Sequence, residues 1–461
     1  MFKKKWKKVT GLILTILCVI SFQSVSVKAA DYWPEAPDIY SPNAIVMEAS
    51  TGTILYEKNS DERHYPASIT KIMTTLIALE NADLNEVVTF SDDAINNTEG
   101  SGISRDYGEQ MTLEQCLYAV MLESANECAY AVAEHVGGTV DHFVELMNAK
   151  AQELGCTNTH FANPHGLQDE NHYTTAHDMA LIAQAAYENE TFRIITGTKI
   201  YTIPPTNKHP NEDTVLRNHQ DMLATYHSAN AKYLYPYCTG GKTGYTTVAN
   251  STLVTYAEKD GMTLICVIMN TQSPHQFADT VSLFDYVFDN FQALNIAEND
   301  ETYDKDSTVN TGKLNNVQSF VELDKDAVVI IPKTAEFADT QSSVEYDDTD
   351  KDIVGSITYT YAGRTVGKAD IKTTGVVIDG YAFDNESTEE TEKEESVSTV
   401  QIQPIFIILV AAAVILLIVL LFLLKKVYDN YYIIRHNREV SKDRRERGRQ
   451  RRNQRRRKRR R

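Results

Sequence analysis

The sequence predicts a mixed α/β domain on a central antiparallel sheet, followed by a small all-β domain and one long apolar segment near the C-terminus. Strand-like runs lie at both ends of residues 30–295 and enclose a helical middle, which favours one sheet with helices packed against it. Residues 300–382 show short alternating runs broken by Gly, Pro and Asp, the pattern of a small β domain. A hydrophobic content of 42% over 461 residues is ample for such cores.

Two strand pairs frame the first domain. NAIVMEASTGTILYEKN, residues 43–59, is two strand-like runs about a Ser-Thr-Gly turn and predicts a hairpin. STLVTYAEKDGMTLICVIMN, residues 251–270, is a second pair of apolar β-type runs about Lys-Asp-Gly. Between and after these pairs, apolar residues recur at intervals of three and four. This spacing predicts helices over 68–80, 112–136, 140–154, 176–188 and 276–293.

Charge is spread very unevenly along the chain, so the net charge of -18 describes no single part of it. Residues 1–30 carry six Lys and no acid, and residues 425–461 carry 18 basic and four acidic residues. Residues 31–424 keep 21 basic against 59 acidic residues. The three zones therefore face different surroundings.

The N-terminal zone has the pattern of a secretory signal peptide over residues 1–29: a basic start, an apolar stretch and a small-residue end. Cleavage after Ala29 is favoured, with Val27 at the minus-three position. The alternative is an uncleaved N-terminal anchor, which the short apolar core disfavours.

The C-terminal zone predicts a single membrane span. Residues 405–424 are twenty apolar residues without a charge, and a helix of this length crosses about 30 Å of hydrocarbon. Residues 383–404 before it are acidic and predict a flexible stalk. The basic tail at 425–461 is expected in the cytoplasm on anionic lipid, which places the acidic bulk outside the cell. Nucleic-acid binding is the disfavoured alternative for the tail.

The cysteines give no metal or disulfide framework. Cys18 leaves with the signal peptide, and the other five are odd in number and widely spaced. Most are expected to be small buried hydrophobes, with one bridge left open. These are Cys116, Cys128, Cys156, Cys238 and Cys266. No metal-ligand spacing is present, and no cofactor is expected.

Three short motifs bring chemistry to the first domain. Ser68 and Lys71, in YPASITKIMTTL, are three residues apart and share one helix face, so the amine can lie beside the hydroxyl. Ser124 and Asn126 place a hydroxyl and an amide in an otherwise apolar helical run. CTGGKTGYTT offers Lys242 and Thr243 to a carboxylate after a Gly-rich approach. Each motif alone also fits an ordinary cap, a satisfied polar pair or a strand entry.

Together, S-x-x-K, S-x-N and K-T-G in this order resemble the serine D-alanyl-D-alanine carboxypeptidases, the low-molecular-weight penicillin-binding proteins of the peptidase S11 type. The resemblance covers about residues 40–380 and includes NPHGL at 163–167 and TTAHD at 174–178. It implies the penicillin-recognising, β-lactamase-like fold for the first domain. It also implies peptidoglycan stem peptides as substrates and β-lactam antibiotics as inhibitors.

The resemblance assigns a role to each motif residue. Ser68 is the nucleophile, Lys71 its base with a lowered pKa, and Ser124 the group that passes protons to the leaving amine. Asn126 orients Lys71 and the substrate amide, and Lys242 and Thr243 hold the terminal carboxylate. Gly244 and Tyr245 follow on the same segment, and the backbone N–H groups of Ser68 and Tyr245 form the oxyanion hole.

Two other functions remain open at this point. A β-lactamase is disfavoured because S-A-N replaces S-D-N and no E-x-x-L-N motif follows before Lys242. A sensor that is acylated without turnover is disfavoured because the predicted cytoplasmic part is only 37 residues long. His64, His160, His165 and His172 lie near the motifs and are expected to be structural.

Overall fold

The computed structural model describes residues 32–226, 228–300, 321–346 and 353–373. The predicted signal peptide, stalk, membrane span and basic tail lie outside these ranges. Within them, no helix combines the length and the apolarity that a membrane crossing requires.

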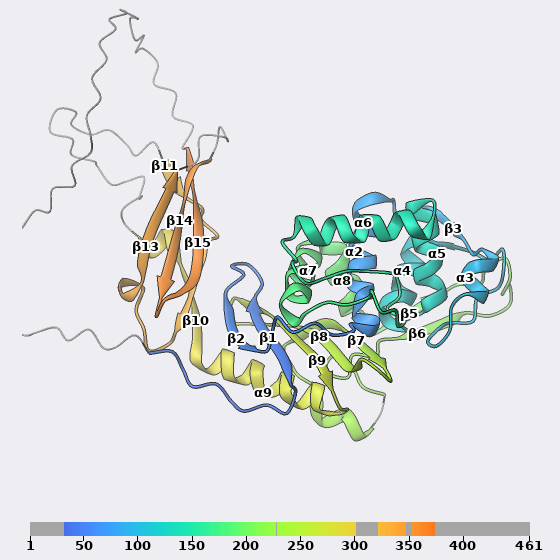
Figure 1. Ribbon diagram of the computed structural model, residues 1–461, viewed down its shortest axis with the longest axis horizontal. Helices are drawn as coiled ribbons and strands as arrows, with labels where there is room; N and C mark the ends of the chain where they lie inside the picture. Colours follow the sequence, from blue (N-terminus) through green and yellow to red (C-terminus); the bar gives the residue numbers. More distant parts are fainter. Residues whose placement is uncertain (1–31, 227, 301–320, 347–352, 374–461) are drawn as a thin grey trace, which may run out of the picture. The chain divides into compact units, whose positions relative to one another are not determined.

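A five-stranded antiparallel sheet organises the first part of the chain, in the order β2-β1-β9-β8-β7 (Figure 1). The N-terminal hairpin β1 (Asn43–Glu48) and β2 (Ile54–Lys58) joins the later pair β8 (Asn250–Lys259) and β9 (Met262–Thr271) through the β1–β9 ladder. The edge strand is β7 (Cys238–Thr246). The sheet predicted from the two ends of the domain is therefore formed, and both predicted hairpins are present.

Both faces of this sheet are covered. Successive side chains along a strand point to opposite faces, and here both sets of side chains pack into an apolar core. In β1, Ile45 and Met47 pack with the helices of the large core, whereas Ala44 and Val46 pack into the second core with α9 (His275–Asn290). Apolar side chains on both faces explain why the strands read as continuous apolar runs. The helices of the large core are α2 (Lys71–Asn81), α4 (Leu113–Leu122), α5 (Asn126–Gly137), α6 (Val140–Glu153), α7 (Ala176–Glu188) and α8 (Glu190–Gly197).

The helix prediction over 112–136 is wrong in one respect that matters for the site. The chain forms α4 and α5 with a break at residues 123–125, where Ser124 has a φ of +61°. This left-handed conformation cannot continue an α-helix. The break also exposes backbone and side chains that a continuous helix would hide.

Short elements that the sequence did not predict complete this part of the chain. They are α3 (Asp92–Asn96), η2 (Ser228–Tyr233), α10 (Ile296–Asn299), and the two-stranded pairs β3 (Val87–Thr89) with β4 (Gln110–Thr112) and β5 (Ile200–Ile203) with β6 (Thr214–Arg217). The 3₁₀ turn η1 (Ala67–Thr70) instead forms the start of the helix predicted over 68–80. Helix α8 was missed as well. Its eight residues are too few for an apolar period to stand out.

A second group of strands follows α9. A four-stranded sheet has the order β11-β15-β14-β13, from β11 (Val321–Leu323), β13 (Gln341–Tyr346), β14 (Ile353–Tyr361) and β15 (Arg364–Thr373). Strand β10 (Phe291–Asn295) pairs with β12 (Val328–Pro332). The β structure thus begins inside the helix predicted to run to 293, which ends at Asn290. A third core of side chains lies among these strands.

The cysteines behave as small apolar residues. All five in the described part of the chain are free, and only Cys156 is partly exposed. Burial raises the pKa of the Cys266 thiol to about 12, which makes it a poor nucleophile. The described residues contain no group of three His, Cys, Asp or Glu side chains that could hold a metal ion.

Candidate active site

Ser68 lies on η1, a single 3₁₀ turn that leads directly into α2. The sequence predicted a helix that begins at Ser68, and the first turn is wound more tightly than an α-helix. Ser68 and Lys71 still share a face, and Lys71 Nζ lies 3.2 Å from Ser68 Oγ. The predicted serine–lysine pair is therefore formed.

Lys71 is fully buried, and its amine has two further partners. Nζ donates to Asn126 Oδ1 at 2.7 Å and to the backbone oxygen of His165 at 2.6 Å. Both partners are oxygens that only accept hydrogen bonds. A neutral amine has two N–H groups and one lone pair, so with both N–H groups engaged the lone pair faces Ser68 Oγ. The site thus holds Lys71 in the orientation of a general base.

The surroundings of Lys71 also favour its neutral form. Burial, and then the positive charge of Lys242, hold the pKa of Lys71 well below its usual value, against a smaller opposite effect of Glu127. This direction agrees with the role expected for Lys71. A neutral lysine at ordinary pH can take a proton from a serine hydroxyl.

A hydrogen-bond chain fixes the residue before the nucleophile. Ala67 has a φ of +52°, a left-handed conformation that costs about 1–2 kcal/mol for a residue with a Cβ. Its carbonyl accepts from Thr70 Oγ1 at 2.8 Å, and Thr70 Oγ1 lies 2.8 Å from His172 Nε2. His172 Nδ1 accepts from the Ala162 N–H, so Nε2 carries the proton and donates to Thr70. His172 therefore supports the turn that aims Ser68.

The NPHGL loop lies against the same turn. Gly166 has a φ of +89°, and a Cβ built there would lie 1.9 Å from the Ala67 carbonyl oxygen. Only glycine permits so close an approach. His165 supplies the carbonyl that holds Lys71, while burial lowers the pKa of its ring to about 3. Sequence reasoning missed that this loop contacts both the turn before Ser68 and the amine of Lys71; the signal was the NPHG turn itself.

At the break between α4 and α5, Ser124 faces the cavity and Asn126 does not. Ser124 lines the cavity, and its Oγ is buried without a hydrogen-bond partner among the described residues. Asn126 lies behind it, with Nδ2 donating to the Glu99 carbonyl and Oδ1 accepting from Lys71. Asn126 thus hydrogen-bonds to Lys71, whereas the structure gives no Ser124–Lys71 hydrogen bond.

Strand β7 carries the third motif to the nucleophile. Gly244 packs so closely on η1 that a Cβ would lie 2.9 Å from Ser68 N and 2.3 Å from Thr252 Oγ1. Lys242 is 1% exposed, its Nζ donates to the Thr243 carbonyl at 3.0 Å, and burial lowers its pKa to about 7. Thr243 rather than Lys242 lines the cavity. Lys242 therefore places its positive charge behind the wall that Thr243 presents.

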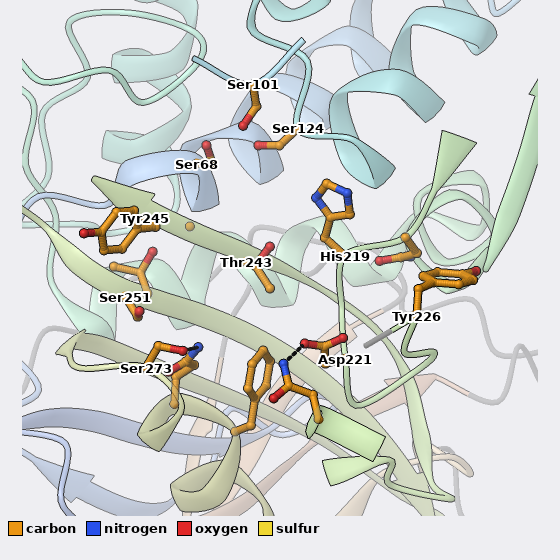
Figure 2. Close-up of a pocket in the computed structure, with 16 residues that line it drawn as sticks. Ser68, Ser101, Ser124, His219, Asp221, Tyr226, Thr243, Tyr245, Ser251 and Ser273 are labelled. Carbon is orange, nitrogen blue, oxygen red and sulfur yellow. Dashed lines mark hydrogen bonds between the residues drawn. The ribbon is translucent and has the colours of Figure 1, made fainter. Parts of the chain in front are cut away.

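One cavity of about 460 Å³ joins these groups (Figure 2). Ser68, Ser124, Thr243, Gly244 and Tyr245 line it, while Lys71, Asn126 and Lys242 lie behind its wall. Figure 2 shows Ser68, Ser101 and Ser124 on the side opposite β7. Sequence reasoning did not predict that Asn218, His219, Asp221, Tyr226 and Asn230 also line this cavity. Their polar composition gave no motif by which to find them.

Comparison with known proteins agrees with this geometry. A family model described as D-alanyl-D-alanine carboxypeptidase, peptidase S11, matches residues 30–273. The chain is 34% identical over 288 residues to D-alanyl-D-alanine carboxypeptidase DacF of Bacillus subtilis, which covers 61% of this chain and 69% of the relative. It is 27% identical over 377 residues to DacA of Haemophilus influenzae, covering 78% and 91% of the two chains.

Solved structures show the same fold. Penicillin binding protein 5 from Haemophilus influenzae superposes with a TM-score of 0.58 at 26% identity, over 74% of this chain and 98% of the other. A D-alanyl-D-alanine carboxypeptidase from Mycobacterium tuberculosis gives a TM-score of 0.51 at 30% identity, over 56% and 94%. The sheet and helices described above are thus the penicillin-binding, β-lactamase-like α/β fold.

Proposed function

The chain belongs to the D-alanyl-D-alanine carboxypeptidase family of serine peptidases, and we propose that it removes the terminal D-alanine of peptidoglycan stem peptides through an acyl-enzyme on Ser68. The observation that carries this proposal is the arrangement of Lys71. Its two N–H groups are held by Asn126 and by the His165 carbonyl, so its lone pair faces the Ser68 hydroxyl.

Acylation begins with the transfer of the Ser68 proton to Lys71. Ser68 Oγ then forms a bond to the carbonyl carbon of the penultimate D-alanine, and the negative charge develops on the carbonyl oxygen. We assign the backbone N–H groups of Ser68 and Tyr245 to this oxygen, because β7 packs on η1 at Gly244. The C–N bond breaks as the amine of the terminal D-alanine takes up a proton.

Ser124 is the group placed to pass that proton from Lys71: it gives its hydroxyl proton to the amine and takes up the proton that Lys71 received from Ser68. Its Oγ lines the cavity and has no partner among the described residues, so it is available to a substrate amine. The negative charge of the terminal carboxylate is met by the Thr243 hydroxyl, with Lys242 behind it. This arrangement restricts the site to substrates that end in a free carboxylate. Water then hydrolyses the ester and restores the Ser68 hydroxyl.

The decisive experiment replaces the nucleophile. Ser68→Ala is expected to abolish both D-alanine release from a stem pentapeptide and covalent labelling by fluorescent penicillin. Ser101→Ala, a hydroxyl in the same cavity, is the matched control and should keep the labelling. Persistence of either signal in Ser68→Ala would remove Ser68 from this role.

The comparisons favour the carboxypeptidase over the two alternatives. The relatives reported above are named carboxypeptidases, and none of those names is a β-lactamase or a sensor. Steady release of D-alanine over many turnovers would agree with an enzyme. One equivalent of acylation without turnover would instead support a sensor.

We further propose that the enzyme is exported and anchored by one span, with its catalytic domain outside the cell. The support is the composition of residues 1–29, 405–424 and 425–461. A variant that lacks 405–461 should be soluble and should keep its D-alanine release. If that variant lost activity, the C-terminal segment would have a part in forming the site.

A further inference from the structure

The catalytic cavity extends beyond the residues that the proposed reaction uses. Strand β7 meets the nucleophile at Gly244, and the carboxylate-binding Thr243 comes one residue earlier. Residues 218–221 lie farther toward the start of β7, because Gln220 Nε2 donates to Thr255 Oγ1 and Thr255 pairs with Gly241. Figure 2 shows His219, Asp221 and Tyr226 on the opposite side of Thr243 from Tyr245. This end of the cavity therefore lies on the side of the leaving residue.

Hydrogen bonds hold the segment 218–221 in place, and three of its four residues line the cavity. Asn218 Nδ2 donates to the carbonyls of Thr196 and Thr198, and Gln220 is 1% exposed against β8. Asn218, His219 and Asp221 line the cavity. A segment that hydrogen bonds fix in place positions a binding group more accurately than a free loop does.

Asp221 is the unusual member of this wall. It is only 9% exposed, and its one side-chain hydrogen bond among the described residues is to the neutral amide of Asn230. None of the ion pairs among the described residues includes Asp221. The basic side chains near it in sequence have other partners: His219 pairs with Glu123 at 3.0 Å, and Arg217 lies over the Tyr226 ring at 4.8 Å. A carboxylate with so little solvent and no cationic partner is costly in an unoccupied site.

The walls around Asp221 suit an aliphatic chain that ends in a cation. The amide of Asn230 binds Asp221, Figure 2 shows Tyr226 on the same side of the cavity, and the ring of Phe277 also lines the cavity. We call these residues, with Asp221, the distal pocket. Apolar walls with one buried charge at a fixed position are the usual design of a selective side-chain pocket. A terminal alanine has only a methyl group and would leave the distal pocket to water.

We propose that the distal pocket binds a side chain ending in a primary ammonium on the residue that follows the scissile bond. This inference rests on the proposed function, because that function places the terminal carboxylate at Thr243. The site then accepts peptides ending in D-Ala-D-Lys as well as D-Ala-D-Ala. Asp221 is the residue that determines the preference for the cation.

Equilibrium binding to the full-length Ser68→Ala protein tests the pocket without turnover. The probes are diacetyl-L-Lys-D-Ala-D-X peptides, in which X is D-lysine or D-norleucine and the blocked first lysine carries no charge. D-Norleucine has the same aliphatic length without the ammonium. We expect D-lysine to bind about tenfold more tightly, the effect of one charge-assisted hydrogen bond. Equal Kd values for the two peptides would overturn the proposal.

A second comparison assigns the effect to Asp221. Asp221→Asn should bring the ratio of the two Kd values to about one, whereas Asp213→Asn, an exposed acid outside the cavity, should leave it unchanged. A ratio that stays tenfold in Asp221→Asn would also overturn the proposal. Failure of the unsubstituted enzyme to release D-alanine would instead refute the proposed function, since these binding experiments require no reaction.

Discussion

Gly166→Ala tests whether the NPHGL loop holds the nucleophile in place. The new Cβ would lie 1.9 Å from the Ala67 carbonyl oxygen, whereas ordinary contacts begin at 3.4 Å. Because that oxygen is backbone and Gly166 has a φ of +89°, either the loop or the turn before Ser68 must move by roughly 1 Å. A displacement of this size at a reacting group costs about 100-fold in rate.

The assay is the second-order rate constant of Ser68 acylation by fluorescent penicillin, measured beside thermal unfolding. Gly155→Ala is the matched control, since Gly155 has a φ of +79° but nothing within 4 Å of its Cβ. Both variants should lose about 1–2 kcal/mol of stability from left-handed strain. Only Gly166→Ala should also lose about 100-fold in acylation. Acylation at the unsubstituted rate in a folded Gly166→Ala would refute the reasoning.

Three further predictions concern charge and protonation. Lys242→Ala should lower kcat/KM for peptides with a free terminal carboxylate more than for their amides, which a comparison of matched peptides would detect; an equal loss would contradict the carboxylate assignment. Because burial lowers the pKa of Lys242 to about 7, kcat/KM should decline as pH rises above about 7. Lys242→Arg should shift that decline to higher pH, since a guanidinium group stays charged. An unchanged pH profile would contradict the role of Lys242 charge in substrate binding. Burial also lowers the pKa values of His165 and His172 to about 3. As the pH falls below 6.5, these two histidines therefore become protonated in the unfolded chain before they do in the folded protein. The free energy of unfolding should drop by about 5 kcal/mol between pH 6.5 and 4.5. His172→Gln should halve that slope in urea titrations, and an unaltered slope would mean that His172 is already protonated in the folded protein.

Local patterns sufficed for the elements whose side chains repeat regularly. The two hairpins, α6 and α7 agree with their predictions because alternating or helical apolar spacing is visible in the sequence itself. The break at Ser124 was not predictable in this way. Apolar helical runs lie before and after it, and the positive φ of Ser124 occurs beside contacts such as Asn126 N with the Ser101 carbonyl, which join residues far apart in the chain.

The same distinction between local patterns and long-range contacts applies to the site. The three motifs, read by themselves, identified which residues carry a hydroxyl, an amine and an anion receptor. Folding decided which of them face the cavity, and it placed Lys242 and Asn126 behind the wall instead of on it. It also recruited the His165 carbonyl, His172 and Gly166, whose function lies in backbone geometry and a tautomer that no residue identity records.

The sequence by itself determined the chemistry of this protein, because the reactive groups are side chains and their order along the chain is specific. The tertiary structure alone decided how they are oriented and how far the cavity reaches past Thr243. Lone pairs, hydrogen-bond directions and the burial of Asp221 all depend on contacts between segments far apart in the chain, such as Ser68 with Gly244, and these contacts leave no mark in the local sequence.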